Sequence, residues 1–126
     1  MAPPATVDEY IAGFPPEVAA RLTRIRSEIV EAVAASSGTR PEEKMRYGIA
    51  AVMLGGRYAL HFAGWKKHIG LYPVPPLPAS LEAEIQPFRA EKDSVVFPHS
   101  KDLPYDLVAR IAREIADERG RQQPAG

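Results

Sequence analysis

The 126-residue sequence contains no cysteine, which excludes disulfides, thiolate nucleophiles and zinc–thiolate sites. It also has no net charge, because 16 basic residues balance 16 acidic ones, so no overall field attracts the chain to nucleic acid or to an anionic membrane. No run approaches the roughly 18 apolar residues that a membrane-spanning helix needs, and the residues up to Phe14 lack the pattern of a signal peptide. We therefore expect a cytoplasmic protein without membrane or nucleic-acid partners.

Known catalytic patterns are missing as well. The sequence has no Gly-x-Ser-x-Gly, no P-loop and no His-Glu-x-x-His. Glu42 and Glu43 are neighbouring carboxylates, but adjacent residues of an extended segment point apart and cannot work as an acid–base pair. The sequence therefore favours a binding protein over an enzyme.

The composition is that of an ordinary globular domain, with hydrophobic residues at 45% and charged residues at 25%. A chain of this length fits one hydrophobic core. We expect a single domain over residues 1–126, with a core from about residue 7 to 119 and a flexible polar tail over 120–126.

Helical segments are predicted at both ends of the chain. A capping box from Thr6 to Glu9 predicts a short helix that ends by Gly13, and Pro16 begins a longer helix that ends before Gly38. A third short helix is expected from Ser80 to Phe88, and a last one from Pro104. The apolar stripes of the two long helices are Val18, Leu22, Ile25, Ile29 and Val33, and Leu107, Val108, Ile111 and Ile115.

Between Glu43 and Tyr72 the hydrophobic period changes to two, which predicts three antiparallel strands. Gly55-Gly56 has the form of a two-residue hairpin turn, and Ser94 to Phe97 is expected to add a fourth strand. The register of the three strands follows from two turns. Residues are paired outward from Gly55-Gly56 and outward from a four-residue turn, Gly64 to Lys67. The predicted pairs are Leu54 with Arg57, Met53 with Tyr58, Ala51 with Leu60, Ile49 with Phe62, Ala63 with His68, and His61 with Gly70.

This register assigns side chains to two faces, because successive strand residues point to opposite sides. The bulky face, expected to hold the helices, comprises Ile49, Met53, Tyr58, Leu60, Phe62, Ile69 and Leu71. The other face, expected to be shallow and polar, comprises Gly48, Ala50, Val52, Ala59, His61, Ala63, His68, Gly70 and Tyr72. The predicted fold is a two-layer α+β domain: an antiparallel sheet of four or more strands with helices packed on one face.

Five stretches of the sequence resemble the YdhG-like family of small bacterial domains of unknown function, which includes proteins proposed to act as frataxin-like iron chaperones. They are Tyr10-Ile11 with Phe14-Pro15, Glu43 to Gly48, Lys66 to Pro73, Lys92 with Val95 to Phe97, and Leu103-Pro104 with Leu107. Lys66-Lys67-His68-Ile69-Gly70-Leu71-Tyr72-Pro73 is the most specific stretch. The resemblance implies helices packed on one side of an antiparallel sheet, and a role in binding iron and passing it to an iron-accepting protein.

Three groups of residues are candidates for binding. His61, His68 and Tyr72 share the small-residue face, where a small ligand could reach them; alternatively, His68 serves only to fix the hairpin by bonding to a backbone carbonyl. Lys66 and Lys67 follow Trp65, and with Lys92 and Arg46 they offer cations beside an aromatic ring, as a phosphate or a single-stranded nucleic acid requires. Because the chain has no net positive charge and no nucleic-acid motif, an anionic small molecule is favoured over a nucleic acid. For iron, the candidate oxygen ligands are Asp8, Glu9, Glu17, Glu28 and Glu31, which a solvated helix surface explains equally well.

Overall fold

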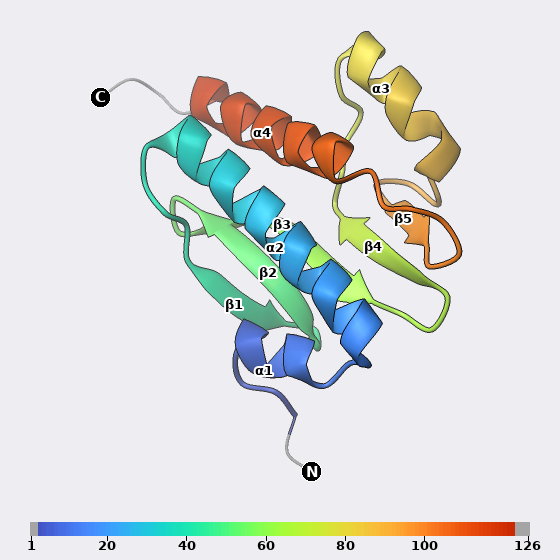
Figure 1. Ribbon diagram of the computed structural model, residues 1–126. Helices are drawn as coiled ribbons and strands as arrows, with labels where there is room; N and C mark the ends of the chain where they lie inside the picture. Colours follow the sequence, from blue (N-terminus) through green and yellow to red (C-terminus); the bar gives the residue numbers. More distant parts are fainter. Residues whose placement is uncertain (1–2, 123–126) are drawn as a thin grey trace.

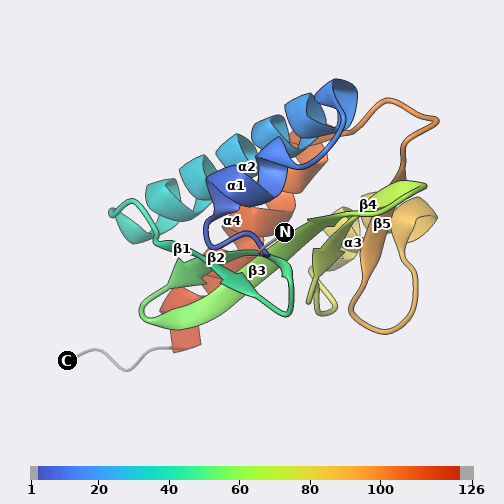
Figure 2. The ribbon, with the colours of Figure 1, turned by 90° about the horizontal axis from the view of Figure 1, so that it is seen from below.

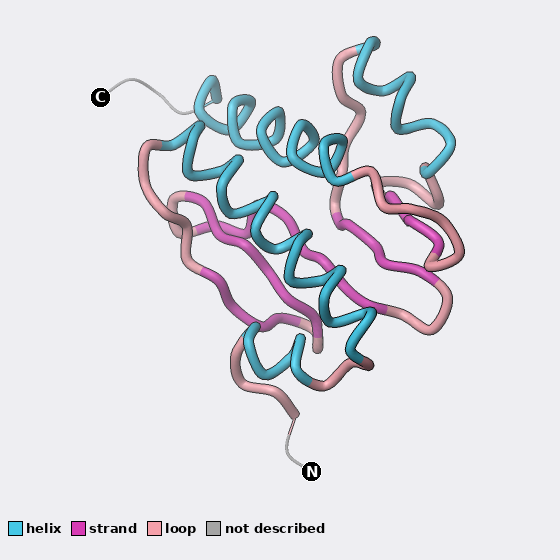
Figure 3. The backbone as a smooth tube through the Cα atoms, in the orientation of Figure 1, coloured by secondary structure: helices cyan, strands magenta, loops and turns pink. Residues whose placement is uncertain are grey.

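The computed structural model describes residues 3–122 as one antiparallel sheet with helices on one of its faces. The elements in chain order are α1 (Val7–Ala12), α2 (Pro16–Ser37), β1 (Glu43–Arg46), β2 (Ile49–Leu54), β3 (Arg57–Gly64), β4 (His68–Tyr72), α3 (Ala79–Ile85), the 3-10 helix η1 (Gln86–Phe88), β5 (Val95–Pro98) and α4 (Tyr105–Gln122). The sheet follows the chain order β1-β2-β3-β4-β5, and α2 and α4 lie side by side across it (Figure 1; Figure 3). The predicted two-layer α+β fold is confirmed.

The helix boundaries agree closely with those predicted. The Thr6 hydroxyl accepts the Glu9 backbone N–H at 3.1 Å and begins α1. Gly38 ends α2 in the left-handed conformation, with φ +81°. The last helix, α4, runs on to Gln122, three residues into the segment predicted as a tail from Gly120, and residues 123–126 lie outside the described part of the chain. Within residues 3–122, no helix has both the length and the apolar character needed to cross a bilayer.

The prediction of three strands between Glu43 and Tyr72 is wrong, because this segment forms four. Tyr47-Gly48 makes a second two-residue turn, in which φ is +56° at Tyr47 and +75° at Gly48. Both values are left-handed, as the turns that fit the twist of a hairpin require. Gly55-Gly56 forms the predicted turn, with φ +59° and +78°.

The pairing of β2 with β3 departs from the predicted register at a β-bulge. Met53 lies opposite Tyr58 as predicted, but Val52 pairs with Leu60, so Ala59 is an extra residue in β3. From that point every pair moves by one residue, and a one-residue shift exchanges the two faces of the partner strand. The predicted pairs Ala51 with Leu60 and Ile49 with Phe62 are therefore wrong; the structure pairs Ala51 with His61 and Ala50 with Phe62.

The bulge corrects the predicted faces at six positions. Ala50 and Val52 face the helices beside Leu60 and Phe62 in the core, although they were expected on the other side. By strand alternation, Met53 and Ile49 lie on the face away from the helices, although Ile49 still packs against the core. Tyr58 lies on the same face and stacks on His61. The bulged Ala59 lines a groove beside α4, so it too departs from the predicted face.

The core fills the space between the helices and the sheet (Figure 2). It joins the apolar stripes of α2 and α4 to alternate residues of the strands, and each large side chain buried there contributes about 1.5 to 3 kcal/mol. Its largest fully buried side chains are Phe62, Phe97, Leu22, Ile25, Ile29, Leu60, Ile69, Leu71, Ile85, Ile111, Val33 and Val52. The other face of the sheet is called the open face below. Its strand residues, by alternation, are Lys44, Arg46, Ile49, Ala51, Met53, Tyr58, His61, Ala63, His68, Gly70, Tyr72, Val96 and Pro98.

A partly buried ion pair fixes the proline-rich segment that follows β4. The Arg89 guanidinium donates to both carboxylate oxygens of Glu82 at 2.8 Å, and also to the carbonyls of Val74 and Pro75. Glu82 accepts the Leu77 backbone N–H as well, at 3.1 Å. The hydrogen bonds from Arg89 are the main reason that the pKa of Glu82 falls from 4.5 to about 2.

We expect this pair to make stability depend on pH. Because the pKa of Glu82 is lower in the folded state, its contribution is complete above pH 4.5 and is lost as the pH falls toward 2. Urea unfolding of the wild type and of Glu82→Gln between pH 2 and 6 measures this contribution. The difference in unfolding free energy between the two proteins should be largest at pH 6 and should shrink on acidification; a difference that does not vary with pH would contradict the assignment.

Candidate functional site

The structure places His61, His68 and Tyr72 on one face of the sheet, as predicted. His61 pairs with Tyr72, and His68 stands four residues before Tyr72 on the same strand, so all three side chains share the open face. The predicted pairs Ala63 with His68 and His61 with Gly70 are nevertheless wrong. The β3–β4 turn lies one residue further along the chain than expected, since Gly64 pairs with Ile69. Each β3 residue therefore pairs two residues further along β4, which leaves the faces unchanged.

His61 is a buried, neutral part of the open face. It is only 7% exposed, and its ring stacks on Tyr58 with the ring centroids 5.4 Å apart. Nδ1 lies 3.2 Å from the Tyr72 carbonyl oxygen, which can only accept, so Nδ1 carries the proton. Burial lowers the pKa of His61, and the charge of Arg46 lowers it further. The remaining nitrogen, Nε2, has no hydrogen-bond partner among the described residues.

Aromatic rings fill the space that the small residues of this face leave. A Cβ atom at Gly70 would lie 1.9 Å from the Tyr72 hydroxyl oxygen, so the tyrosine ring lies directly over this glycine. The Trp65 indole Nε1–H donates to the same hydroxyl at 2.9 Å, and Trp65 is 47% exposed. The open face is therefore covered by rings, and the prediction of a shallow surface of small residues around two histidines is wrong.

A cation joins a second group of rings on this face. The Arg46 guanidinium carbon lies 4.0 Å from the centre of the Tyr58 ring and 4.6 Å from that of Tyr47. Arg46 also donates to the Tyr47 hydroxyl at 2.9 Å. Tyr47 is 82% exposed although it occupies a left-handed position of the turn. We call Arg46, Tyr47, Tyr58, His61, Trp65 and Tyr72 together the aromatic layer.

Tyr47 and Tyr58 are residues of this layer that the sequence analysis missed as site candidates. Tyr58 was assigned to the core because the bulge at Ala59 was not foreseen. Tyr47 had one usable signal, the following Gly48, since a tyrosine–glycine pair between two alternating segments can form a hairpin turn.

The predicted cationic residues divide between the two ends of β4. Lys66 and Lys67 form the turn that follows Trp65 and leads into His68, so these residues lie together. Lys92 lies in the loop before β5, next to Asp93, whose carbonyl accepts the Val74 N–H just beyond the other end of β4. Because β4 has five residues, Lys92 lies about 17 Å from the turn along the strand direction. The structure does not bring Lys92 to the other two lysines.

Charge is divided unequally between the two layers. The strand residues of the open face include Lys44, Arg46 and His68 but no aspartate or glutamate. None of the ion pairs among residues 3–122 uses Lys44, Arg46, Lys66 or Lys67.

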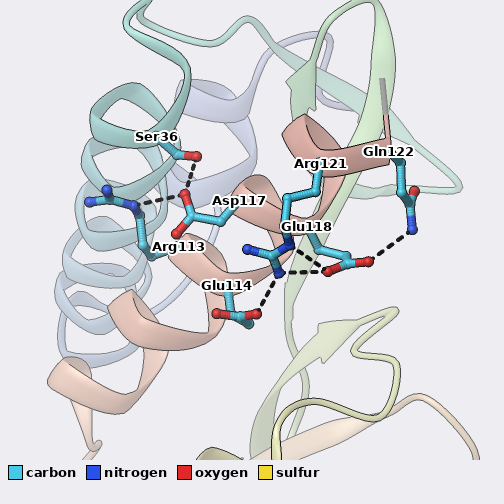
Figure 4. Close-up of polar contacts among 7 residues, drawn as sticks. All are labelled: Ser36, Arg113, Glu114, Asp117, Glu118, Arg121 and Gln122. Atoms are coloured by element: carbon cyan, nitrogen blue, oxygen red, sulfur yellow. Dashed lines mark hydrogen bonds and ion pairs between the residues drawn. The ribbon is translucent and has the colours of Figure 1, made fainter. Parts of the chain in front are cut away.

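The helical layer, in contrast, holds most of the ion pairs. On α4, Asp117 accepts hydrogen bonds from Arg113 and from the Ser36 hydroxyl of α2, and Arg121 pairs with Glu118 (Figure 4). These donors hold the pKa of the Asp117 and Glu118 carboxyls below their usual values. Lys44, Arg46, Lys66 and Lys67 therefore form a group of cations outside the ion pairs on the open face and its β3–β4 turn.

The carboxylates predicted as iron ligands do not form one cluster. Within residues 3–122, no group of three or more histidine, aspartate or glutamate side chains could hold a metal ion. Asp8 pairs with Arg26, Glu28 pairs with Arg24, and Glu31 accepts from the Ser27 hydroxyl at 2.8 Å, whereas Glu17 is exposed in the first turn of α2. Glu9 accepts the Ala5 backbone N–H at 3.0 Å. Iron binding stays a prediction from the resemblance.

A cavity of about 570 Å³ lies at the other end of the sheet, between the ends of α2 and α4 and the Gly55-Gly56 turn. Arg119 lines it, but this guanidinium already donates to the Tyr58 carbonyl beside the bulge. Its pKa is lowered because it is buried and lies near Arg57. We interpret Arg119 as a support for the bulge.

A solved structure that resembles this chain identifies the fold. The chain superposes on a YdhG protein of the DUF1801 family from Bacillus subtilis with a TM-score of 0.67, over 93% of both chains and with 15% sequence identity. The chain has the YdhG fold. This is the fold of the family that the sequence resembles, so the fold implied by the resemblance is confirmed. No family model matches the sequence, and no curated protein matches it either.

Proposed function

We propose that this YdhG-fold protein is a non-enzymatic binding domain that holds an anionic small molecule on the open face, beside the β3–β4 turn. The observation that carries the proposal is the set of cations without an ion-pair partner, Lys44, Arg46, Lys66 and Lys67, on and next to a face whose strand residues include no carboxylate. A cation without a protein partner attracts a ligand anion most strongly where no competing carboxylate is near.

The ligand chemistry follows from the residues at this turn. Lys66 and Lys67 are flexible ammonium groups, which bind phosphate as point charges. Trp65 beside them has an exposed ring on which a planar group can stack. We therefore propose a phosphate-bearing metabolite with a planar ring as the class of ligand.

Removing the two turn lysines should weaken binding. In the double variant Lys66→Ala/Lys67→Ala, we expect inorganic phosphate and nucleoside monophosphates to raise the melting temperature less than they do in the wild type, because two of the cations near the ligand are gone. Lys92→Ala is the matched control, since it also removes a lysine charge but at the far end of β4. Equal thermal shifts in the wild type and the double variant would refute the proposed site.

An iron titration distinguishes this proposal from the role that the resemblance implies. Under anaerobic conditions, iron binding of that kind should be saturable and should perturb Glu28, Glu31 and the other predicted carboxylates of α1 and α2. Anion binding should instead perturb the β3–β4 turn. A search for an iron-accepting protein partner would follow only if the titration shows saturable iron binding at these carboxylates.

A further inference from the structure

We propose that the open face binds single-stranded nucleic acid, with bases stacked on Tyr47 and Trp65 and phosphates next to Lys44, Lys66 and Lys67. The inference rests on the proposed function, because the same turn holds the phosphate, and it extends the ligand from a single anion to a strand. Zero net charge argued against nucleic acid in the sequence analysis. Net charge does not describe one surface, however: the strand residues of the open face include Lys44 and Arg46 but no carboxylate.

The exposed rings lie at one end of the sheet. Tyr47 is in the β1–β2 turn and Trp65 begins the β3–β4 turn, and both turns stand at the end where β2 begins and β3 ends. In an antiparallel sheet with strands about 4.8 Å apart, these two turns are roughly 10 Å from each other, which one short oligonucleotide can span. Tyr47 and Trp65 are the large hydrophobic side chains that stand out as exposed among the described residues.

The rings are held in place before any ligand binds. Trp65 is fixed by the hydrogen bond from its indole N–H to the Tyr72 hydroxyl. Tyr47 is fixed by the hydrogen bond that its hydroxyl accepts from Arg46 and by its backbone position in the β1–β2 turn. Rigid rings lose little conformational entropy on binding, so stacking on them is more favourable than stacking on mobile side chains. The guanidinium of Arg46, between Tyr47 and Tyr58, adds a positive charge without a carboxylate partner.

The shape of this surface selects a single strand over a duplex. Sequence-reading proteins place a helix or a two-stranded ribbon in the groove of a duplex, whereas here the rings stand on a sheet whose helices all pack on the opposite face. Unpaired bases expose their planes, and proteins bind them by stacking on aromatic side chains beside a row of cations. An acidic peptide would satisfy the cations but would leave the two rings without planar partners.

Fluorescence anisotropy with labelled single-stranded oligonucleotides tests the inference on the full 126-residue chain. We expect an eight-nucleotide strand to bind more tightly than a mononucleotide and to quench Trp65 fluorescence.

Trp65→Ala should weaken binding about tenfold and Trp65→Phe much less, because phenylalanine keeps the stacking surface. Lys66→Ala/Lys67→Ala should reduce the slope of log K against log salt by about 1.4, for two phosphates lost. Arg113→Ala, on the helical layer, should change neither the affinity nor the salt slope. Melting temperatures confirm that each variant is folded.

The outcomes separate this inference from the proposed function. If inorganic phosphate binds at the turn but the oligonucleotide binds no more tightly than a mononucleotide, the inference fails and the proposed function stands. If neither binds, both fail. Equal affinity for duplex DNA, or for polyglutamate of the same charge, would also overturn the inference, because stacking of unpaired bases would then contribute nothing.

Discussion

Leu60→Asp should leave the protein unfolded at neutral pH. Leu60 is 1% exposed and lies in the centre of β3, where it faces the helices. Truncating a buried leucine costs about 2 to 5 kcal/mol, and a carboxylate buried without a partner adds several more. Since small domains are stable by about 5 to 15 kcal/mol, the sum removes most or all of the unfolding free energy.

Circular dichroism and urea unfolding measure this effect. The matched control is Arg57→Asp, which places the same residue type at the exposed beginning of the same strand and should change stability little. A Leu60→Asp protein with a cooperative, wild-type unfolding transition would show that this side of β3 does not form the core.

Gly64→Ala should destabilise the protein by about 1 to 3 kcal/mol, the usual range for overpacking a core. A Cβ atom at this position would lie 2.7 Å from the Phe14 ring and 3.2 Å from Leu22. Phe14 cannot move freely, because its ring packs edge-on against Tyr10, whose hydroxyl accepts the Gly64 N–H at 3.1 Å. The added methyl group therefore disturbs the contact between α1, α2 and the end of β3.

Gly120→Ala is the control for this prediction. Gly120 lies in α4, a Cβ atom there meets no other atom within 4 Å, and its backbone is not left-handed. Alanine favours a helix over glycine by about 0.5 to 1 kcal/mol, so this variant should be slightly more stable. Thermal unfolding of both variants should show shifts of opposite sign, and a stabilising Gly64→Ala would contradict the described packing.

The parts of the fold that could be predicted from sequence are those set by neighbouring residues. The stripes of α2 and α4 and the Gly55-Gly56 turn depend on local spacing and on backbone freedom, and all three are confirmed. Tyr47 was missed because a tyrosine is uncommon at positive φ, so the following Gly48 was the one local signal for a turn there.

The bulge could not be predicted because its support is distant in sequence. Ala59 has no pattern that marks a bulge, and the Tyr58 carbonyl beside it accepts a hydrogen bond from Arg119, 61 residues further along the chain. That single extra residue moves Tyr58 out of the predicted core and onto the ring of His61. The shared face of His61, His68 and Tyr72 could be predicted because all three lie beyond the bulge on β3 and β4.

The central claim is that ligands bind to the unpaired cations and exposed rings at one end of the open face. The most direct test is an NMR titration of the isotope-labelled protein with a nucleoside monophosphate, followed residue by residue. We expect the largest shifts at the amides of Tyr47, Lys66, Lys67 and His68 and at the indole N–H of Trp65. Shifts confined to α2 and α4, or to the cavity beside Gly55-Gly56, would contradict it.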